Sequence, residues 1–187
     1  MVVPSFGLRH GCPAKGWSAC HEAYDRGNLS VPGTYLELTA CIHAHKCAVF
    51  GLTGNLSGSK AHSSTDVQAW QVLAEGAAMP VRCIDSEHHE PYVVLRHTDE
   101  TPTFDEDFYG YHLNKIELII QLRIAGYSLE VVGKGFLCHV PHLESTSKVD
   151  SRCSQKCRAS IKNLLRLAKT EWKTVYTGVT PATPMCK

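Results

Sequence analysis

The sequence lacks a long hydrophobic run, and it lacks a strong excess of charge of either sign. No apolar stretch approaches the roughly 20 residues that cross a bilayer, and the first residues do not combine a charged region with an apolar one, so neither a membrane-spanning helix nor a signal peptide is predicted in it. The formal net charge of +1 argues against a nucleic-acid-binding stripe and a polybasic membrane surface. Internal repeats are absent as well. With 187 residues, 43% hydrophobic and 20% charged, the composition is typical of one globular domain.

Cysteine is abundant by contrast, with nine residues. So many thiols are unusual in a reduced cytosolic domain and typical of a secretory-pathway protein with several disulfides. Their odd number leaves at least one thiol unpaired, and the spacing does not give the connectivity. Cys41, His43, His45 and Cys47 form a candidate zinc cluster, but their spacing matches no standard zinc knuckle. We therefore favour disulfide-bonded or solvated residues over a zinc site there.

Regular structure is predicted most clearly in the middle of the chain. Residues 91–96 are β-branched and aromatic, which predicts a strand that begins at a proline. Residues 98–107 form a polar, carboxylate-rich loop. Residues 114–125 carry isoleucines at helical spacing and a second apolar side, which predicts a helix packed against a sheet on one flank and another element on the other. Gly126 fits its C-terminal cap.

The chain after this helix is predicted to return to β structure. Residues 127–132 and 136–140 are predicted strands, separated by a Gly-Lys-Gly turn. Side chains alternate between the two faces of a strand. His139 is therefore predicted on the face opposite to Phe136 and Cys138.

Outside this region the patterns are weaker. Residues 11–33 have glycines, prolines and no clear periodicity, and they are predicted as loop, as is the Gly- and Ser-rich segment 51–64. Residues 66–74 are predicted to form a short helix with Val67, Trp70 and Leu73 on its inner face, and residues 151–173 a longer one. A frayed tail is expected at 174–187.

The densest set of motifs lies between residues 90 and 142. These are EPYVV from residue 90, FDEDFYGY from residue 104, Asn114-Lys115, and GFLCHVPH from residue 135. The stretch resembles the C-terminal part of the catalytic domain of glycosyltransferase family 49, which holds the LARGE-like xylosyl- and glucuronyltransferases and a β-1,4-glucuronyltransferase. A weaker likeness extends upstream to HSSTDVQAW from residue 62 and VVPSF near the N-terminus. One domain is therefore expected over residues 1–173.

The resemblance implies a GT-A-like α/β domain with a mixed sheet flanked by helices. Such a domain binds a UDP-sugar donor and a divalent metal, usually Mn²⁺, and transfers the sugar with inversion to a glycan hydroxyl; glucuronic acid is the candidate sugar. The acceptor hydroxyl needs a base to take its proton, and the departing diphosphate needs a cation to balance its charge. The resemblance also implies a type II protein of the Golgi lumen, whose membrane anchor would precede Met1.

The same resemblance implies roles for individual residues. His139 matches the metal ligand, and an imidazole nitrogen suits Mn²⁺ beside carboxylates. The catalytic base is expected in the acidic turn, first at Asp105 and next at Glu106. Asp107 departs from the family, which usually has Arg there, and this departure bears on the choice of acceptor. The residues expected to contact substrate are Gly110, Tyr111, Asn114 and His142.

The nucleotide-binding half of the family's domain has no counterpart in this sequence. Its Asp-x-Asp strand belongs directly before the segment that starts at Val2, where this chain begins. Asp105 and Asp107 satisfy the bare pattern, but they lie far downstream in a turn. A truncated gene model, a natural fragment or a degenerate homologue would each explain this, and the chain alone is expected to be inactive.

Each assignment has a plainer alternative. On its own the acidic turn would be a solvated loop, and His139 would be a strand histidine bonded to a neighbour. Asn114 fits either a helix cap or a hydrogen bond to a sugar. The whole chain would then be a non-catalytic carbohydrate-binding or interaction module derived from the same family. An Asp-x-Asp strand encoded upstream of Met1 favours the enzyme, and an intact gene that begins at Met1 favours the module.

Overall fold

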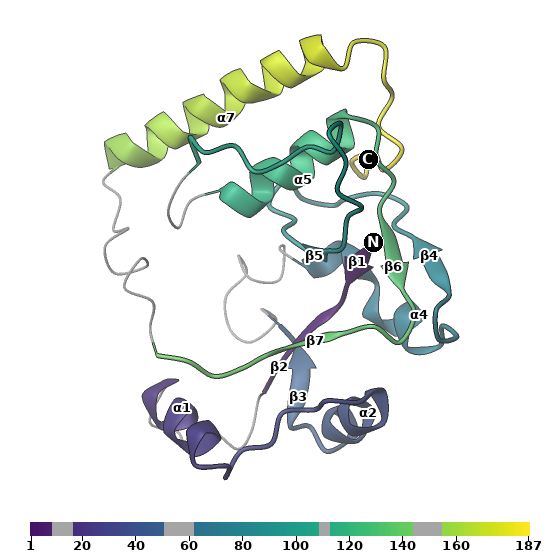
Figure 1. The fold of residues 1–187 in the computed structure, drawn as a ribbon, viewed down its shortest axis with the longest axis vertical. Coiled ribbons are helices and arrows are strands. Elements are labelled where there is room, and N and C mark those ends of the chain that lie inside the picture. Colours follow the sequence, from purple (N-terminus) through teal and green to yellow (C-terminus); the bar gives the residue numbers. More distant parts are fainter. Residues whose placement is uncertain (9–16, 51–61, 109–112, 144–154) are drawn as a thin grey trace.

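Two small β-sheets form the centre of the fold, and helices lie at both ends of it (Figure 1). The structure is a computed structural model that describes residues 1–187 except 9–16, 51–61, 109–112 and 144–154. The strands are β1 (Val2–Val3), β2 (Ser5–Leu8), β3 (Cys47–Val49), β4 (Ala78–Pro80), β5 (Tyr92–Val93), β6 (Glu130–Val132) and β7 (Leu137–His139). The helices are α1 (Trp17–Asp25), α2 (Tyr35–His43), the 3₁₀ turn η1 (Ser63–Thr65), α4 (Val67–Gln71), α5 (Asn114–Ile124) and α7 (Gln155–Val175).

Two chain segments, one with β1 and β2 and one with β6 and β7, run through both sheets and join them. One sheet has the strand order β4-β6-β1-β5, and the other has the order β3-β2-β7. Only Pro4 separates β1 from β2, and these strands pair in parallel with β6 and β7, respectively. The Leu137 N–H donates to the Pro4 carbonyl at 2.9 Å, so hydrogen bonding continues across the junction. The remaining pairs are antiparallel, so both sheets are mixed and the predicted α/β class is confirmed.

A bend between β6 and β7 keeps the two segments paired although they differ in length. One residue joins β1 to β2, whereas residues 133–136 join β6 to β7. Lys134 takes up the extra length with a left-handed φ of 62°. A Cβ on Gly133 would lie 2.1 Å from the Ala74 carbonyl oxygen, so this position needs a residue without a side chain. The Gly-Lys-Gly segment, predicted as a tight turn, is instead a bend between two strands that run in the same direction beside β1 and β2.

We expect Gly133→Ala to lower the free energy of unfolding by about 1–3 kcal/mol, because the new methyl group fits only if neighbouring backbone moves. Gly33→Ala is the matched control, since the nearest atom to its Cβ would be a Glu37 carboxylate oxygen at 3.6 Å. Urea denaturation measures both free energies. Equal stability of the two variants would contradict the close approach at Gly133.

The main core surrounds the short helix α4. Trp70 is fully buried, and its indole N–H donates to a carbonyl of β6 at 3.0 Å. Its ring lies 5.4 Å from that of Phe6 and 5.5 Å from that of Tyr35. Val67 and Leu73 pack against the same core. The predicted short helix is therefore confirmed, and it buries the face expected from its spacing.

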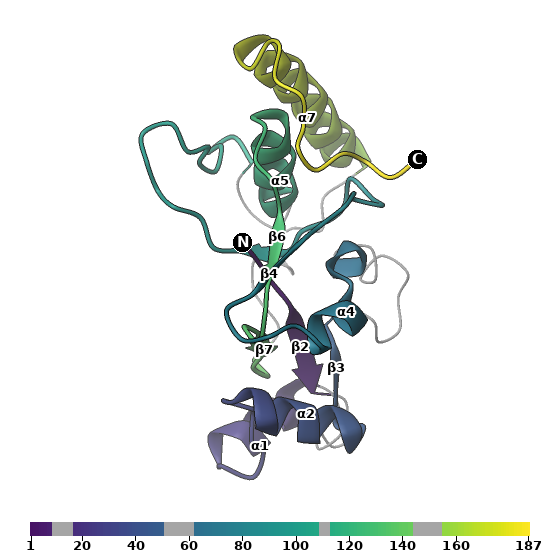
Figure 2. The same ribbon diagram turned by 90° about the vertical axis from the view of Figure 1, so that its right-hand side faces the viewer.

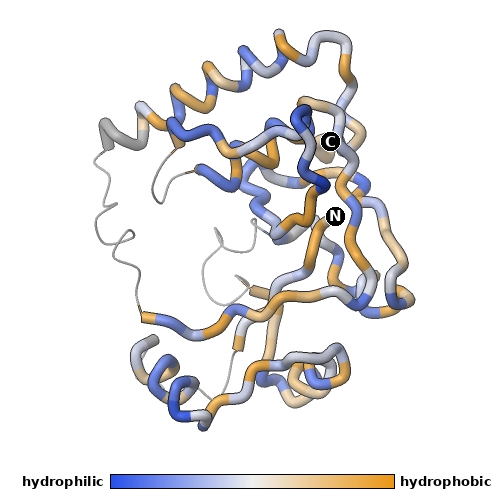
Figure 3. The backbone as a smooth tube through the Cα atoms, viewed as in Figure 1, coloured by the Kyte–Doolittle hydropathy of each residue, from blue (hydrophilic) through white to orange (hydrophobic). Residues whose placement is uncertain are grey.

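Helix α5 is packed on two sides. Leu118 and Leu122 belong to the main core beneath it. Ile116 and Ile120 form a second cluster with Trp172 of α7, which runs alongside α5 (Figure 2). Hydrophobic and hydrophilic residues alternate along α7 (Figure 3), as expected for a helix with one packed face. The prediction of a helix packed on both flanks is confirmed.

Three other predictions differ from the structure. The strand expected at 91–96 is only two residues long, because its partner β1 offers only Val2 and Val3 for pairing. The strand expected at 127–132 begins at Glu130. The segment 11–33, predicted as loop, contains α1. Among the described residues of that helix only Cys20 is buried, so apolar periodicity did not indicate it.

The end of the chain packs against the fold, although a frayed tail was expected. Thr183 is buried; its hydroxyl accepts a hydrogen bond from the Leu129 N–H, and its carbonyl accepts one from the Arg123 side chain, both at 2.9 Å. A disulfide joins Cys83 to Cys186. These contacts are long-range in sequence, so local composition gave no sign of them.

A second disulfide joins Cys41 to Cys47. Both thiolates of the candidate zinc cluster are thereby consumed, and the disulfide interpretation is confirmed. Cys138 is the free thiol among the described cysteines, consistent with the odd cysteine count. Among the described helices, none combines the length and apolar character that crossing a membrane requires.

Candidate functional site

The acidic turn of residues 105–107 is fixed by its own hydrogen bonds. The Asp107 N–H donates to Asp105 Oδ1 at 2.9 Å, and the Phe108 N–H donates to the Asp105 carbonyl at 3.0 Å. Asp105 is partly buried, whereas Glu106 and Asp107 are exposed. An aspartate that bonds the backbone two residues on is a common way to hold such a bend. The turn thus presents three carboxylates on a defined backbone.

Glu117 of α5 holds this turn from beneath. Its side chain is fully buried, and Oε1 accepts a hydrogen bond from the Asp105 N–H at 3.1 Å. Oε2 has no hydrogen-bond partner among the described residues. The pKa of Glu117 is raised to about 7, mainly by burial; the bond from the Asp105 amide lowers it, and the charge of Asp105 raises it. The buried ring of Phe108 anchors the other side of the turn in the cluster between α5 and α7.

His139 lies on β7 with its ring against Phe50. The two ring centroids are 4.4 Å apart with planes 13° from parallel, and the His142 ring lies 5.0 Å from His139. Burial lowers the pKa of His139, and the nearby His142 lowers it as well. A neutral imidazole keeps a nitrogen lone pair for a metal ion. The chemistry of His139 therefore fits a metal ligand.

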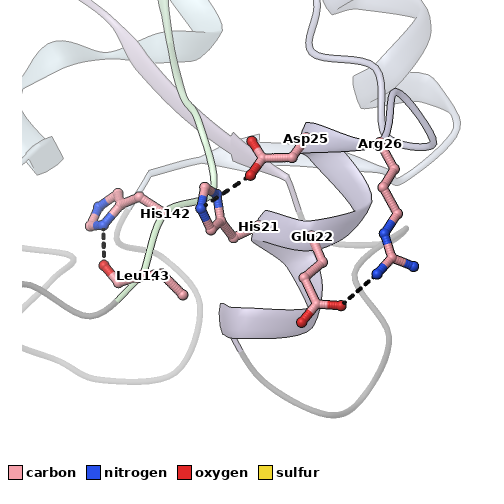
Figure 4. Close-up of polar contacts among 6 residues, drawn as sticks. All are labelled: His21, Glu22, Asp25, Arg26, His142 and Leu143. Carbon is pink, nitrogen blue, oxygen red and sulfur yellow. Dashed lines mark hydrogen bonds and ion pairs between the residues drawn. The ribbon is translucent and has the colours of Figure 1, made fainter.

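The segment after β7 passes close to α1 (Figure 4). There the exposed His142 has its Nδ1 2.6 Å from the Leu143 carbonyl oxygen. On α1, the His21 ring lies 3.3 Å from the Asp25 carboxylate. These contacts orient the two histidines on facing segments.

A row of side chains connects β7 with the start of α5. The Phe50 ring lies 5.9 Å from that of His62, which is stacked 6.1 Å from that of Tyr92. Lys115 Nζ lies 5.4 Å from the Tyr92 ring and 3.0 Å from Glu90 Oε2. Burial lowers the pKa of His62; the Glu90 charge raises it and the Lys115 charge lowers it. The structure thus brings together two of the sequence motifs, EPYVV and Asn114-Lys115.

The expected site residues fall into separate groups. His139 lies near His142 on the segment from β7, and the acidic turn lies against α5; these elements occupy different halves of the molecule in Figures 1 and 2. Within the described part of the chain, no hydrogen bond or ion pair joins Asp105 to His139. Gly110 and Tyr111 lie outside the described residues.

Asn114 begins α5, but it does not cap the helix. The N-cap position is Leu113, and the Asn114 side-chain oxygen accepts a hydrogen bond from the Lys115 N–H at 2.8 Å. Of the two alternatives for Asn114, the helix cap is therefore not observed.

Sequence reasoning did not find Glu117 or His62. Glu117 could have been noticed as a lone acid inside an otherwise apolar helix, because a buried acid needs a specific partner. His62 gave no such signal, since its environment depends on three segments that are distant in sequence. Among the described residues, no group of three or more His, Cys, Asp or Glu could hold a metal ion.

Comparison with known proteins identifies the family of the chain. A family model described as a glycosyl-transferase for dystroglycan matches residues 21–177, which is most of the chain. The chain belongs to this glycosyltransferase family. The match confirms the resemblance inferred from the motifs, and it includes the acidic turn, Glu117, His62 and both histidines of the segment from β7.

Relatives within the family are xylosyl- and glucuronyltransferases. The chain is 31% identical to LARGE1 of Danio rerio over 106 residues and 29% identical to LARGE1 of Homo sapiens over 106 residues. It is 32% identical to LARGE2s of Gallus gallus over 105 residues. These matches cover 56–57% of this chain and 13% of each relative. The chain therefore corresponds to a small part of the length of the curated relatives it matches.

Proposed function

We propose that this chain forms the C-terminal part of a glycosyltransferase catalytic domain that transfers a sugar from a UDP-sugar donor to a glycan hydroxyl with inversion. The family match over residues 21–177 carries the proposal. The relatives' names mention xylosyl and glucuronyl transfer, and glucuronic acid is the sugar we propose. We propose that donor binding needs a GT-A-like nucleotide-binding half in addition to the residues of this chain.

Asp105 is proposed as the base that takes the proton of the acceptor hydroxyl. Its turn is held by Glu117 and by the buried Phe108 ring, and a base must be held in place to act in a transition state. Glu106 is the second choice, because it is exposed and adjacent. Asn114, His142, Gly110 and Tyr111 remain the proposed substrate contacts.

His139 is proposed as a ligand of Mn²⁺. Its partly buried, neutral imidazole fits that role, and the remaining ligands would come from outside the described residues. A divalent ion at this place would balance the negative charge of the leaving diphosphate. Within this chain, stacking on Phe50 fixes the plane of the imidazole ring.

The Golgi lumen is the proposed compartment. The disulfides Cys41–Cys47 and Cys83–Cys186 support an oxidising environment of the secretory pathway.

A direct assay tests the proposed function. Purified chain, and a longer protein that also carries an Asp-x-Asp segment, would be incubated with UDP-glucuronic acid or UDP-xylose, Mn²⁺ and oligosaccharide acceptors. We expect Mn²⁺-dependent product only with the longer protein, detected by mass spectrometry. Acceptor binding without any transfer by the longer protein would instead support a non-catalytic carbohydrate-binding module.

Glu117→Gln is expected to change how stability depends on pH. The pKa of Glu117 is raised from its ordinary 4.5 to about 7, so between these values the folded state keeps a proton that the unfolded state has lost. The wild-type contribution is fully present below pH 4.5, and up to about 3 kcal/mol is lost as pH rises to 7. The Gln variant should lack this loss while keeping an acceptor for the Asp105 amide.

Guanidinium denaturation at pH 5 and pH 8 measures the difference. Glu171→Gln, a change of an exposed acid on α7, is the control and should follow the wild type. Identical pH dependence in the Glu117 variant and the wild type would show that Glu117 does not titrate as proposed.

A further inference from the structure

A basic groove lies along α7, next to the start of α5. It has a volume of about 380 Å³, and it is bordered by α7, the start of α5 and the segment at residues 87–88. Its floor includes the aliphatic side chains of Leu113, Ile116 and Leu165. Leu113 immediately precedes Asn114, so the groove borders one of the residues proposed to contact substrate.

Four cationic side chains line the groove from one side of α7. They are spaced by four, three and four residues, which places them within about 60° of the helix circumference at 100° per residue. Glu171, the acidic residue of α7, falls on the opposite side of the helix. The buried contacts of α7 are made by Ala168 and Trp172. The cations are therefore not needed for packing. They are Lys162, Arg166, Lys169 and Lys173.

One carboxylate of the chain already forms an ion pair with one of these four cations. Glu87 lies in the segment that borders the groove at residues 87–88, and its Oε1 lies 2.6 Å from Lys169 Nζ. Arg166 donates to Asn163 Oδ1 at 3.0 and 3.2 Å, a neutral acceptor that leaves its charge unbalanced. Lys162 and Lys173 are exposed, and no ion pair to either occurs within the part of the chain that the structure describes. Most of the positive charge is thus available to an external anion.

We propose that the basic groove binds an extended, acidic peptide segment of another protein. Successive cations are about 6, 4.5 and 6 Å apart along the helix axis, and alternate side chains of an extended peptide are about 6.6 Å apart. Carboxylates on one face of such a peptide would meet the cations, and its apolar side chains would meet the aliphatic floor. His88 is the one aromatic ring among the described lining residues, so the groove offers little surface on which nucleic acid bases could stack.

The test uses the purified chain and a fluorescent twelve-residue peptide with glutamate at alternate positions, followed by fluorescence anisotropy at low salt. Changing Lys162 and Lys173 together to Ala should weaken binding about tenfold, because two exposed charge pairs are lost. The control variant, with Lys46 and Lys187 changed to Ala, removes the same charge elsewhere and should bind like the wild type. Glu87→Gln should strengthen binding several-fold, because Lys169 loses its internal partner.

Three outcomes would overturn the proposal. Equal weakening in both double variants would show attraction to net charge alone. Unchanged affinity in the groove variant would remove the site. A sulfated oligosaccharide that binds more tightly than the peptide, and loses affinity in the groove variant alone, would make the occupant a polyanionic carbohydrate. Circular dichroism of each variant checks that the fold is retained, and no outcome depends on glycosyl transfer.

Discussion

Asp105→Ala is expected to reduce sugar transfer by about two to four orders of magnitude, because loss of a positioned general base has an effect of this size. The measurement uses a longer protein that holds this chain together with the donor-binding half, and it compares initial rates at saturating acceptor. Binding of UDP, followed by calorimetry, should stay near the wild-type value. Asp105 contacts Glu117 through its backbone, and that contact does not depend on the carboxylate.

Two companion variants make this result specific. Glu106→Ala tests the second choice of base, and Asp99→Ala removes an exposed acid from the same loop without touching the turn. We expect the Asp99 variant to retain its activity. Unaltered turnover in both the Asp105 and the Glu106 variants would remove the acidic turn from the mechanism.

His139→Ala should raise the Mn²⁺ concentration that supports half-maximal transfer by at least about tenfold, since even residues that only support metal ligands alter affinity by 10–100-fold. The same longer protein would be titrated with Mn²⁺ under fixed donor and acceptor. His45→Ala, a change of an exposed histidine after α2, is the control. Thermal unfolding of both variants separates lost metal affinity from lost stability.

An unchanged Mn²⁺ dependence in the His139 variant would argue against ligation. The histidine would then be a packing partner of Phe50, the plainer interpretation of its place on β7. His142→Ala helps to distinguish these cases. It should leave the metal requirement close to wild type if His142 contacts substrate rather than metal.

The most periodic parts of the sequence predicted their structure best. The helix expected at 114–125 matches α5 within one residue, because isoleucine spacing reports a packed face directly. Trp70 was likewise placed on the inner face of a short helix. The glycines at 133 and 135 correctly indicated a break between two strands, although the chain bends there and does not turn back. In each case the residues that determine the local structure are close together in the sequence.

Other features depend on partners far away in sequence. The length of β5 is set by the two residues of β1, and the burial of Thr183 depends on Leu129 and Arg123. The fully buried Glu117 was missed because its amide partner lies 12 residues upstream in a loop. The motifs predicted the acidic turn and His139 as functional. They did not predict the intervening row of rings, whose members come from separate segments.

The continuous passage of two strand segments through both sheets has a consequence for how the molecule opens. β1 continues into β2 and β6 continues into β7, and the hydrogen bond from the Leu137 N–H to the Pro4 carbonyl lies at the junction of the two sheets. Separating the two sheets would therefore disrupt both continuous segments and this hydrogen bond. The centre of the protein is therefore a single cooperative unit, and slow amide exchange in one sheet entails slow exchange in the other.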